Sequence, residues 1–197
     1  MKALLFWLSG FLPCHLIGDE GHPHLERYYL CTAFGVRFYL HRYVGSDQTR
    51  GLHDNPWPWA ASIVLSGWHW EERRGMENSE IARTLAALYG TTGLVRKRVR
   101  WFNWLTGDSF HRIVLPNILN RKWVDGRYVK NAAQPCWTLF FHRATNTKPW
   151  GFLRPMEGHT AAFWVPHNYP LDGTSSTETN QWWLKAPHGS DCEGRQA

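Results

Sequence analysis

Short apolar and aromatic runs, separated by turn residues, set the pattern of this chain. Residues 28–43 form one such run, which is rich in aromatic side chains and broken by Gly35, and this indicates two strands or one strand with a bend. Further runs follow at intervals of about ten residues, and Gly, Pro, Asn or Asp residues separate them. This spacing is typical of an all-β sandwich or barrel, so we expect one antiparallel β domain.

Three segments carry more specific expectations. The apolar run 60–65 and the alternating run 68–72 flank Ser66-Gly67, which predicts a hairpin. Residues 123–129 predict a second hairpin through Asp125-Gly126. Residues 136–142 form a continuous apolar strand, and we expect residues 150–153 to be its partner.

Helical patterns are confined to two places. Between residues 76 and 89, Ile81, Leu85 and Leu88 recur at helical spacing, which predicts one helical insertion between strands. The chain begins with a short apolar stretch that predicts an amphipathic helix packed on the domain. We therefore divide the chain into an N-terminal extension (1–16), a β domain (17–170) and a polar tail (171–197), which is flexible unless Trp182-Trp183 docks.

Composition narrows the class of protein. Of the 197 residues, 43% are hydrophobic and 19% are charged, which excludes a chain that is disordered throughout. We expect most of the 13 tryptophans to lie in the core. The net charge of +6 favours anionic partners such as nucleotides or sugar phosphates.

The cysteines and the N-terminal stretch bear on where the protein works. The four cysteines have no C-x-x-C spacing, so we interpret them as reduced thiols. The N-terminal apolar run is too short to span a bilayer, and no A-x-A-like cleavage site follows it. We expect a cytoplasmic protein without a membrane partner.

The candidate chemistry gathers around three polar side chains. His53 and Asn55 are separated by one residue, so on a strand both point to one face while Asp54 points to the other. His111 lies on a later strand that follows a Gly turn, and in a barrel the two strands can be neighbours. The pattern predicts a small-molecule pocket around His53, Asn55 and His111.

Longer stretches of the chain resemble a known group of proteins, the uncharacterised bacterial and phage cupins of the RmlC-like jelly-roll kind. Their first motif, in which His-Asp-His-Pro-Trp precedes an apolar strand, a Gly turn and Trp-Glu-Glu, is similar to LHRYVGSDQTRGLHDNPWPWAASIVLSGWHWEE. Their second motif and closing strands resemble WFNWLTGDSFHRIVL and CWTLFFHRATNTKPWGF. The resemblance covers residues 17–165 and implies a double-stranded β-helix with a central cavity.

The resemblance also implies a metal site. Cupins that bind metal supply an H-x-H pair, a glutamate shortly after it and a histidine from the second motif, which implies His53 and His111 as ligands and catalytic residues. Asn55 stands in place of the second histidine of the pair, and residues 59–62 contain no carboxylate. Asn55, Glu71 or a nearby histidine would have to complete a site for iron, manganese, nickel or zinc. A homodimer is implied as well.

Aromatic and basic side chains near these positions are the expected ligand-binding residues. The set comprises Asn55, Trp57, Trp59, Trp70, Arg96, Arg98 and Arg100. The three arginines alternate along one predicted strand, so they share a face that can meet phosphates or protect a sheet edge. Four histidines in loop-like segments show no metal spacing and receive no role: His22, His24, His159 and His167.

Three functions are compatible with these residues. The first is a protein that binds a small anionic ligand, such as a nucleotide or sugar nucleotide, in the cavity around His53, Asn55 and His111. The second is a cupin enzyme of the oxygenase, isomerase or epimerase type, in which His53 and His111 hold a metal or a histidine acts as general base. Nucleic-acid binding through Arg96 to Arg100 ranks last, because jelly rolls place their function in the cavity.

Overall fold

The computed structural model describes residues 1–19, 22–47, 51–74, 94–116, 122–124, 127–129, 133–155, 162–167 and 179–195. Antiparallel strands make up most of these residues. The helical insertion predicted at 76–89 lies outside the described residues.

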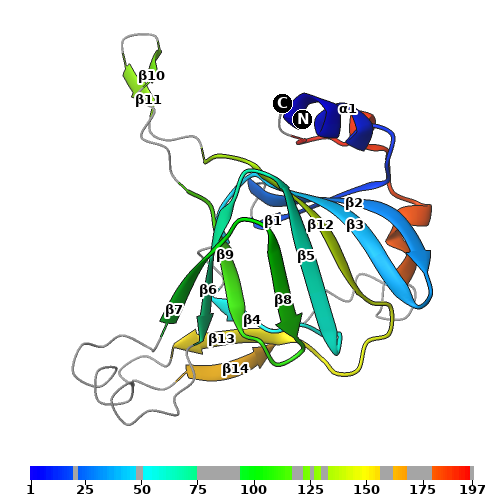
Figure 1. The fold of residues 1–197 in the computed structure, drawn as a ribbon, viewed down its shortest axis with the longest axis vertical. Coiled ribbons are helices and arrows are strands. Elements are labelled where there is room, and N and C mark those ends of the chain that lie inside the picture. Colours follow the sequence, from blue (N-terminus) through cyan, green and yellow to red (C-terminus); the bar gives the residue numbers. More distant parts are fainter. Residues whose placement is uncertain are drawn as a thin grey trace.

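Two six-stranded sheets form the body of the molecule (Figure 1). The first sheet has, in spatial order, β1 (Cys14–Asp19), β2 (His22–Ala33), β3 (Val36–Tyr43), β12 (Cys136–Arg143), β5 (Trp59–Ser66) and β8 (Phe102–Thr106). The second has β14 (Ala162–Pro166), β13 (Gly151–Pro155), β4 (Leu52–His53), β9 (His111–Val114), β6 (His69–Arg74) and β7 (Leu94–Val99). Separate from both is the hairpin of β10 (Lys122–Val124) and β11 (Arg127–Val129), which confirms the one predicted at 123–129.

The chain passes repeatedly from one sheet to the other. From β3 onward it alternates, with β3, β5, β8 and β12 in the first sheet and β4, the β6–β7 pair, β9 and β13 in the second. This alternation wraps the strands around one interior, which is the arrangement of a double-stranded β-helix. The predicted all-β jelly roll is confirmed.

Two of the predicted strand pairings are wrong, because in both cases the chain crosses from the first sheet to the second between the two strands. The strands on either side of Ser66-Gly67, β5 and β6, belong to different sheets, so this turn is a corner and not a hairpin. Gly67 has a φ of +83°, and a Cβ there would lie 2.9 Å from the carbonyl oxygen of Pro135. Likewise β12 pairs with β3 and β5, whereas β13 pairs with β4 and β14.

The expected division at Gly35 is confirmed, because β2 and β3 are two strands joined by a tight turn. Phe34 and Gly35 both have positive φ, as a two-residue type I′ hairpin turn requires.

The tryptophans are less buried than the sequence predicted. Among those with described side chains only Trp137 is fully buried, because most of the others lie on outer faces or at sheet edges.

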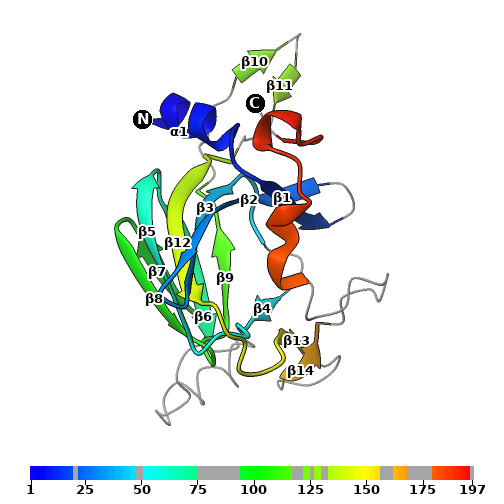
Figure 2. The same cartoon turned by 90° about the vertical axis from the view of Figure 1, so that its right-hand side faces the viewer.

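The two ends of the chain pack on the first sheet (Figure 2). Residues 2–9 and 189–195 cover its outer face, whereas Trp182 and Trp183 contact Tyr39 and Tyr29 on the face that carries Arg27. Helix α1 (Lys2–Ser9) precedes β1, and two short 3-10 helices, Thr179–Leu184 and Gly189–Asp191, end the described chain. Trp183 stacks on Tyr29 with ring centroids 4.0 Å apart, so the Trp182-Trp183 pair docks on the domain. Within the part of the chain that is described, no helix has the length and apolar character needed to cross a bilayer.

Candidate functional site

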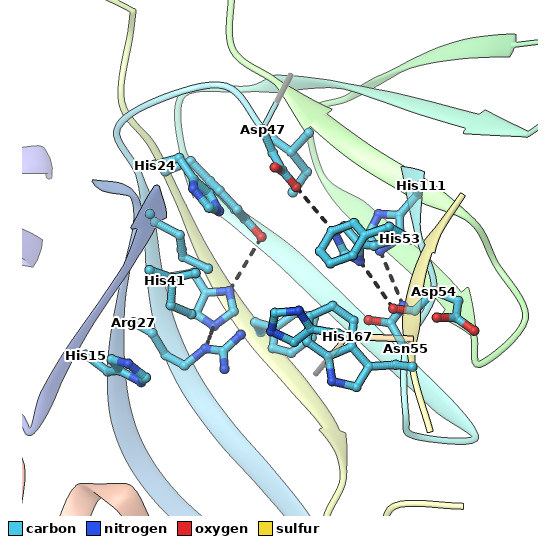
Figure 3. A pocket seen from close by; sticks show the side chains of 18 of the residues that line it. His15, His24, Arg27, His41, Asp47, His53, Asp54, Asn55, His111 and His167 are labelled. Carbon is cyan, nitrogen blue, oxygen red and sulfur yellow. Dashed lines mark hydrogen bonds and ion pairs between the residues drawn. The ribbon is translucent and has the colours of Figure 1, made fainter. Parts of the chain in front are cut away.

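A cavity of about 520 Å³ lies between the two sheets (Figure 3). Its polar lining contains the three predicted residues His53, Asn55 and His111, and Trp57 lines it as well. Further histidines, Arg27 and Asp47 also contribute to the wall. The volume falls within the range of about 300–1,000 Å³ that is usual for small-molecule sites.

His53 and His111 are direct neighbours across two strands. They are paired in the register between β4 and β9, and their ring centroids lie 4.6 Å apart. This confirms that the two strands are adjacent, as the sequence predicted. The chain crosses from the first sheet to the second before β4 and again before β9, and the two strands become neighbours in the second sheet.

A buried carboxylate stands behind His111. Glu71 Oε1 lies 3.1 Å from Nδ1 of His111, an ion-pair distance, although the approach is too bent for a regular hydrogen bond. Nε of Arg73 and Nδ2 of Asn103 donate to the same carboxylate at 2.8 and 2.9 Å. Burial on its own would raise the pKa of Glu71, but the contacts with His111 and Arg73 outweigh it and lower the pKa to about 2. Glu71 is therefore ionised and holds the Nδ1–H tautomer of His111.

Asn55 faces the other nitrogen of His111. Its Nδ2 lies 3.3 Å from Nε2 of His111, which accepts the hydrogen because Nδ1 carries the proton. Asp54 points the opposite way, as the alternation predicts. Its carboxylate accepts hydrogen bonds from the backbone N–H of Gly151 at 2.7 Å and from Nζ of Lys148 at 2.9 Å, which fixes β4 against the start of β13.

His53 is held between a carbonyl and a carboxylate. Its Nδ1 donates to the carbonyl oxygen of Asp54 at 3.2 Å, and its Nε2 lies 3.5 Å from Oδ2 of Asp47. Asp47 is buried in the segment after β3, where its backbone N–H donates to the carbonyl oxygen of Ile113.

Arg27 supplies a positive charge to the opposite wall (Figure 3). Its Nε donates to Nε2 of His41 at 3.1 Å, so His41 carries its own proton on Nδ1, 3.5 Å from the hydroxyl of Tyr43. Burial, and then the charge of Arg27, lower the pKa of His41 well below its ordinary value. His41 accepts the hydrogen bond of Arg27 but carries no negative charge, so the charge of Arg27 is not compensated by this contact.

Aromatic rings form the apolar wall of the cavity. Trp150 packs against His167 and Phe152 with centroids 4.3 and 5.5 Å apart, and His53 lies edge-on to Trp150. Trp57 is stacked on His142 at 3.7 Å, so one of its faces is already covered. The wall can therefore contact a planar group beside Trp150.

Several predicted ligand-binding residues lie outside the cavity. Trp59 stacks on Trp104 at 5.3 Å, and Trp70 lies under the guanidinium of Arg96 at 4.9 Å. Arg96, Arg98 and Arg100 are exposed on or just after β7, and Arg96 also pairs with Glu72. They share a face, as alternation predicted, but that face is the outer one, because the alternating Val99 is buried and Arg96 and Arg98 lie over Trp70 and Trp68.

Other cavity residues escaped the sequence reasoning. His24 and His167, which received no role, both line the cavity, and so do Arg27 and Asp47. Arg27 follows Glu26 directly on β2, so the alternation of side chains along a strand could have predicted that these two residues face opposite sides of the sheet. Asp47 sits in a turn-like sequence, where nothing marks its approach to His53.

The predicted metal ligands do not form a preformed metal site. Nε2 of His111 accepts from the Asn55 amide, and Glu71 lies behind His111 rather than beside His53. Throughout the described residues, no three His, Cys, Asp or Glu side chains converge as metal ligands do.

No protein-family profile matches the sequence, and no curated protein matches it either. Among solved structures, a cupin-2 domain protein from Rhodospirillum rubrum is similar over 74% of this chain and 76% of its own, with a TM-score of 0.44 and 12% identity. Hydroxypropylphosphonic acid epoxidase from S. wedmorenis is similar over 66% of this chain, with a TM-score of 0.41 and 8% identity, and an oxalate oxidase over 68%, with 0.39 and 12%.

The match spans only 55% of the epoxidase and 58% of the oxidase. At these TM-scores and identities, no residue role is carried over from any of the three proteins.

Proposed function

We propose that the protein binds a small anionic molecule in the cavity between the two sheets. The observation that carries this proposal is Arg27. Its half-buried guanidinium lines the cavity, makes its hydrogen bond through Nε to a neutral histidine, and has no carboxylate partner among the residues described. A cation held in a partly desolvated wall without a counterion favours an anionic ligand.

The other polar groups give the ligand an orientation. Because Nδ2 of Asn55 donates to His111, the amide oxygen of Asn55 is the acceptor that remains for a ligand N–H or O–H. Tyr43 accepts from His41, so its own hydroxyl hydrogen can be donated to the anion. A ligand with a charged end at Arg27 and a donor group at Asn55 satisfies both walls.

The aromatic wall extends the proposal to the class of ligand. Trp150 and Phe152 both line the cavity, and because their rings are tilted by 54° to each other, each offers a separate flat apolar face. A nucleotide or sugar nucleotide combines an anionic group with a ring that can pack there, and it agrees with the net charge of +6. We also propose that the chain is related to the phage and bacterial cupins that its His-Asp-x-Pro-Trp motif resembles.

Arg27→Met is expected to weaken binding of such a ligand about tenfold to a hundredfold, because a charge-assisted hydrogen bond is lost from a partly buried site. We would first identify compounds that co-purify with the protein by mass spectrometry. Titration calorimetry with inorganic phosphate, nucleoside monophosphates and sugar phosphates would then give the affinities. Methionine keeps the apolar stem of arginine, so the variant tests the charge.

Arg98→Met is the matched control, since Arg98 is exposed on β7 outside the cavity. It is expected to bind as the unaltered protein does. Equal affinities for the unaltered protein, Arg27→Met and Arg98→Met would contradict the proposal.

A second candidate is an acid–base enzyme acting on the same class of ligand. The contact between Glu71 and His111 favours it, because a carboxylate behind Nδ1 leaves Nε2 as a base directed at Asn55 and the cavity. A substrate that displaces the Asn55 amide from Nε2 would meet that lone pair. Here His111 takes the proton, Glu71 stabilises the resulting imidazolium, and Asn55 orients the substrate.

Recovery of the bound compound in an altered form, with turnover abolished in His111→Ala, is expected if the protein is an enzyme. Elemental analysis of the unaltered protein, His53→Ala and His111→Ala should be run in parallel. Stoichiometric metal that disappears in both variants would replace the acid–base scheme by a metal-dependent one. An unaltered compound and no turnover would leave binding as the function.

A further inference from the structure

Helix α1 has two apolar sides, and only one of them is packed. On the inner side, Ser9 is fully buried and Leu5, Phe6 and Leu12 pack against the cluster that contains Tyr28 and Trp137. This side covers the outer face of the first sheet. It accounts for the docking of the helix that the sequence predicted.

The C-terminal end of the chain fixes the helix in place. Arg195 donates through Nε to the hydroxyl of Tyr28 at 3.0 Å and through Nη2 to Oγ of Ser9 at 2.6 Å and the carbonyl oxygen of Phe6. The backbone N–H of Ser190 donates to the carbonyl oxygen of Gly10. These bonds hold α1 in one orientation, so its outer side is presented rigidly.

The outer side is exposed and strongly apolar. The exposed fractions are 56% for Leu4, 61% for Trp7, 43% for Leu8 and 61% for Phe11. These residues recur at intervals of three and four, and the Trp7 and Phe11 rings pack edge to face 5.0 Å apart. The result is one continuous aromatic and aliphatic stripe that faces solvent.

The N-terminal segment itself carries only positive charge, while the C-terminal segment packed beside it exposes Asp191 and Glu193. Residues 1–18 contain no Asp or Glu, and Lys2 is exposed on the same helix. The whole chain carries a net charge of +6. The net charge of the whole molecule therefore favours a negatively charged surface.

We propose that α1 docks the protein on an anionic lipid bilayer, with Trp7 and Phe11 inserted at the level of the headgroups. The helix is too short to cross a bilayer but suits the interface, where tryptophan and an apolar helix face are preferred. A second copy of the chain is the weaker occupant, because an eight-residue helix is about 12 Å long and offers far less than the ~800 Å² per partner of a standard interface. The proposal replaces our sequence-based expectation of no membrane partner.

The test is co-sedimentation of the full chain with large vesicles of phosphatidylcholine, with and without phosphatidylserine. We expect binding to the phosphatidylserine vesicles that weakens as salt is raised. The double variant Trp7→Ser/Phe11→Ser is expected to reduce the partition coefficient about tenfold or more, since two large apolar side chains no longer enter the interface. Its thermal unfolding should be unchanged because both side chains are exposed.

Phe34→Ser/Trp101→Ser is the matched control, as it removes one phenylalanine and one tryptophan that are exposed elsewhere, at 100% and 80%. It should bind vesicles like the unaltered protein. The proposal is overturned if the unaltered protein does not bind, or if both double variants bind equally well. It is also overturned if Trp7→Ser/Phe11→Ser changes the mass by light scattering and not the vesicle binding, because α1 would then be an interface between copies.

Discussion

Glu71→Ala is expected to lower the free energy of unfolding by about 3 kcal/mol or more. The carboxylate of Glu71 is fully buried and accepts hydrogen bonds from Arg73 on its own strand and from Asn103 on β8 of the opposite sheet. Alanine would leave the buried amide of Asn103 without this partner and the Arg73 charge without its carboxylate. Urea unfolding, followed by circular dichroism, measures the loss.

Glu72→Ala is the control for this prediction, because Glu72 is the next residue on β6 and pairs with Arg96 and Arg112 at a partly exposed position. Ion pairs in such positions contribute about 1 kcal/mol or less. If the two alanine variants are equally stable, the buried carboxylate does not tie the sheets together. Glu71→Gln, which keeps the shape, should recover part of the loss.

The same network shows how far the sequence alone could lead. The alternation of apolar and polar residues and the turn chemistry are local, and they were sufficient to predict an all-β sandwich or barrel. The jelly roll was implied by the resemblance of the longer motifs to cupins. The placement of His53 beside His111 could also be anticipated, because both lie on strands of one barrel and flank turns. Glu71 was expected near a metal, but its partner is the far side of the His111 ring.

Strand partners could not be predicted in the same way. A Ser-Gly turn makes a hairpin or a corner with the same local chemistry, and the packing of Gly67 against Pro135, far along the chain, decides between them. The face that Arg27 presents depends likewise on β2 lying between β1 and β3, and on α1 and Arg195 covering the opposite side at Tyr28. These are long-range contacts, so no local pattern records them.

Acid is expected to unfold this protein well above the pH at which carboxylates are neutralised. Three histidines that belong to the two facing sheets are almost completely buried: His41, His69 and His142. Burial lowers the pKa of His41 well below its ordinary value, that of His69 to about 4 and that of His142 to about 3. All three are therefore neutral in the folded protein at pH 7.

The direction of the effect follows from where each state takes up its protons. In the unfolded chain these histidines protonate near pH 6.5, whereas the folded chain resists protonation down to about pH 4 for His69 and about pH 3 for His142. As the pH falls through this window the unfolded state binds more protons, so stability is lost. Each histidine contributes a slope of up to about 1.4 kcal/mol per pH unit, and three together give about 4.

A fall from pH 6.5 to 5 would then cost up to about 5 kcal/mol, because the full slope is reached only below the pKa of the unfolded chain, and this loss is comparable with the whole stability of many domains. Urea midpoints measured between pH 8 and pH 5 should drop steeply below about pH 6.5. His69→Gln and His142→Gln should each reduce the slope by up to one proton, whereas His188→Gln, at an exposed position, should leave it unchanged. A flat pH profile in the unaltered protein would mean that these rings are charged or hydrated within the fold, which the packing of His142 against Trp57 at 3.7 Å opposes.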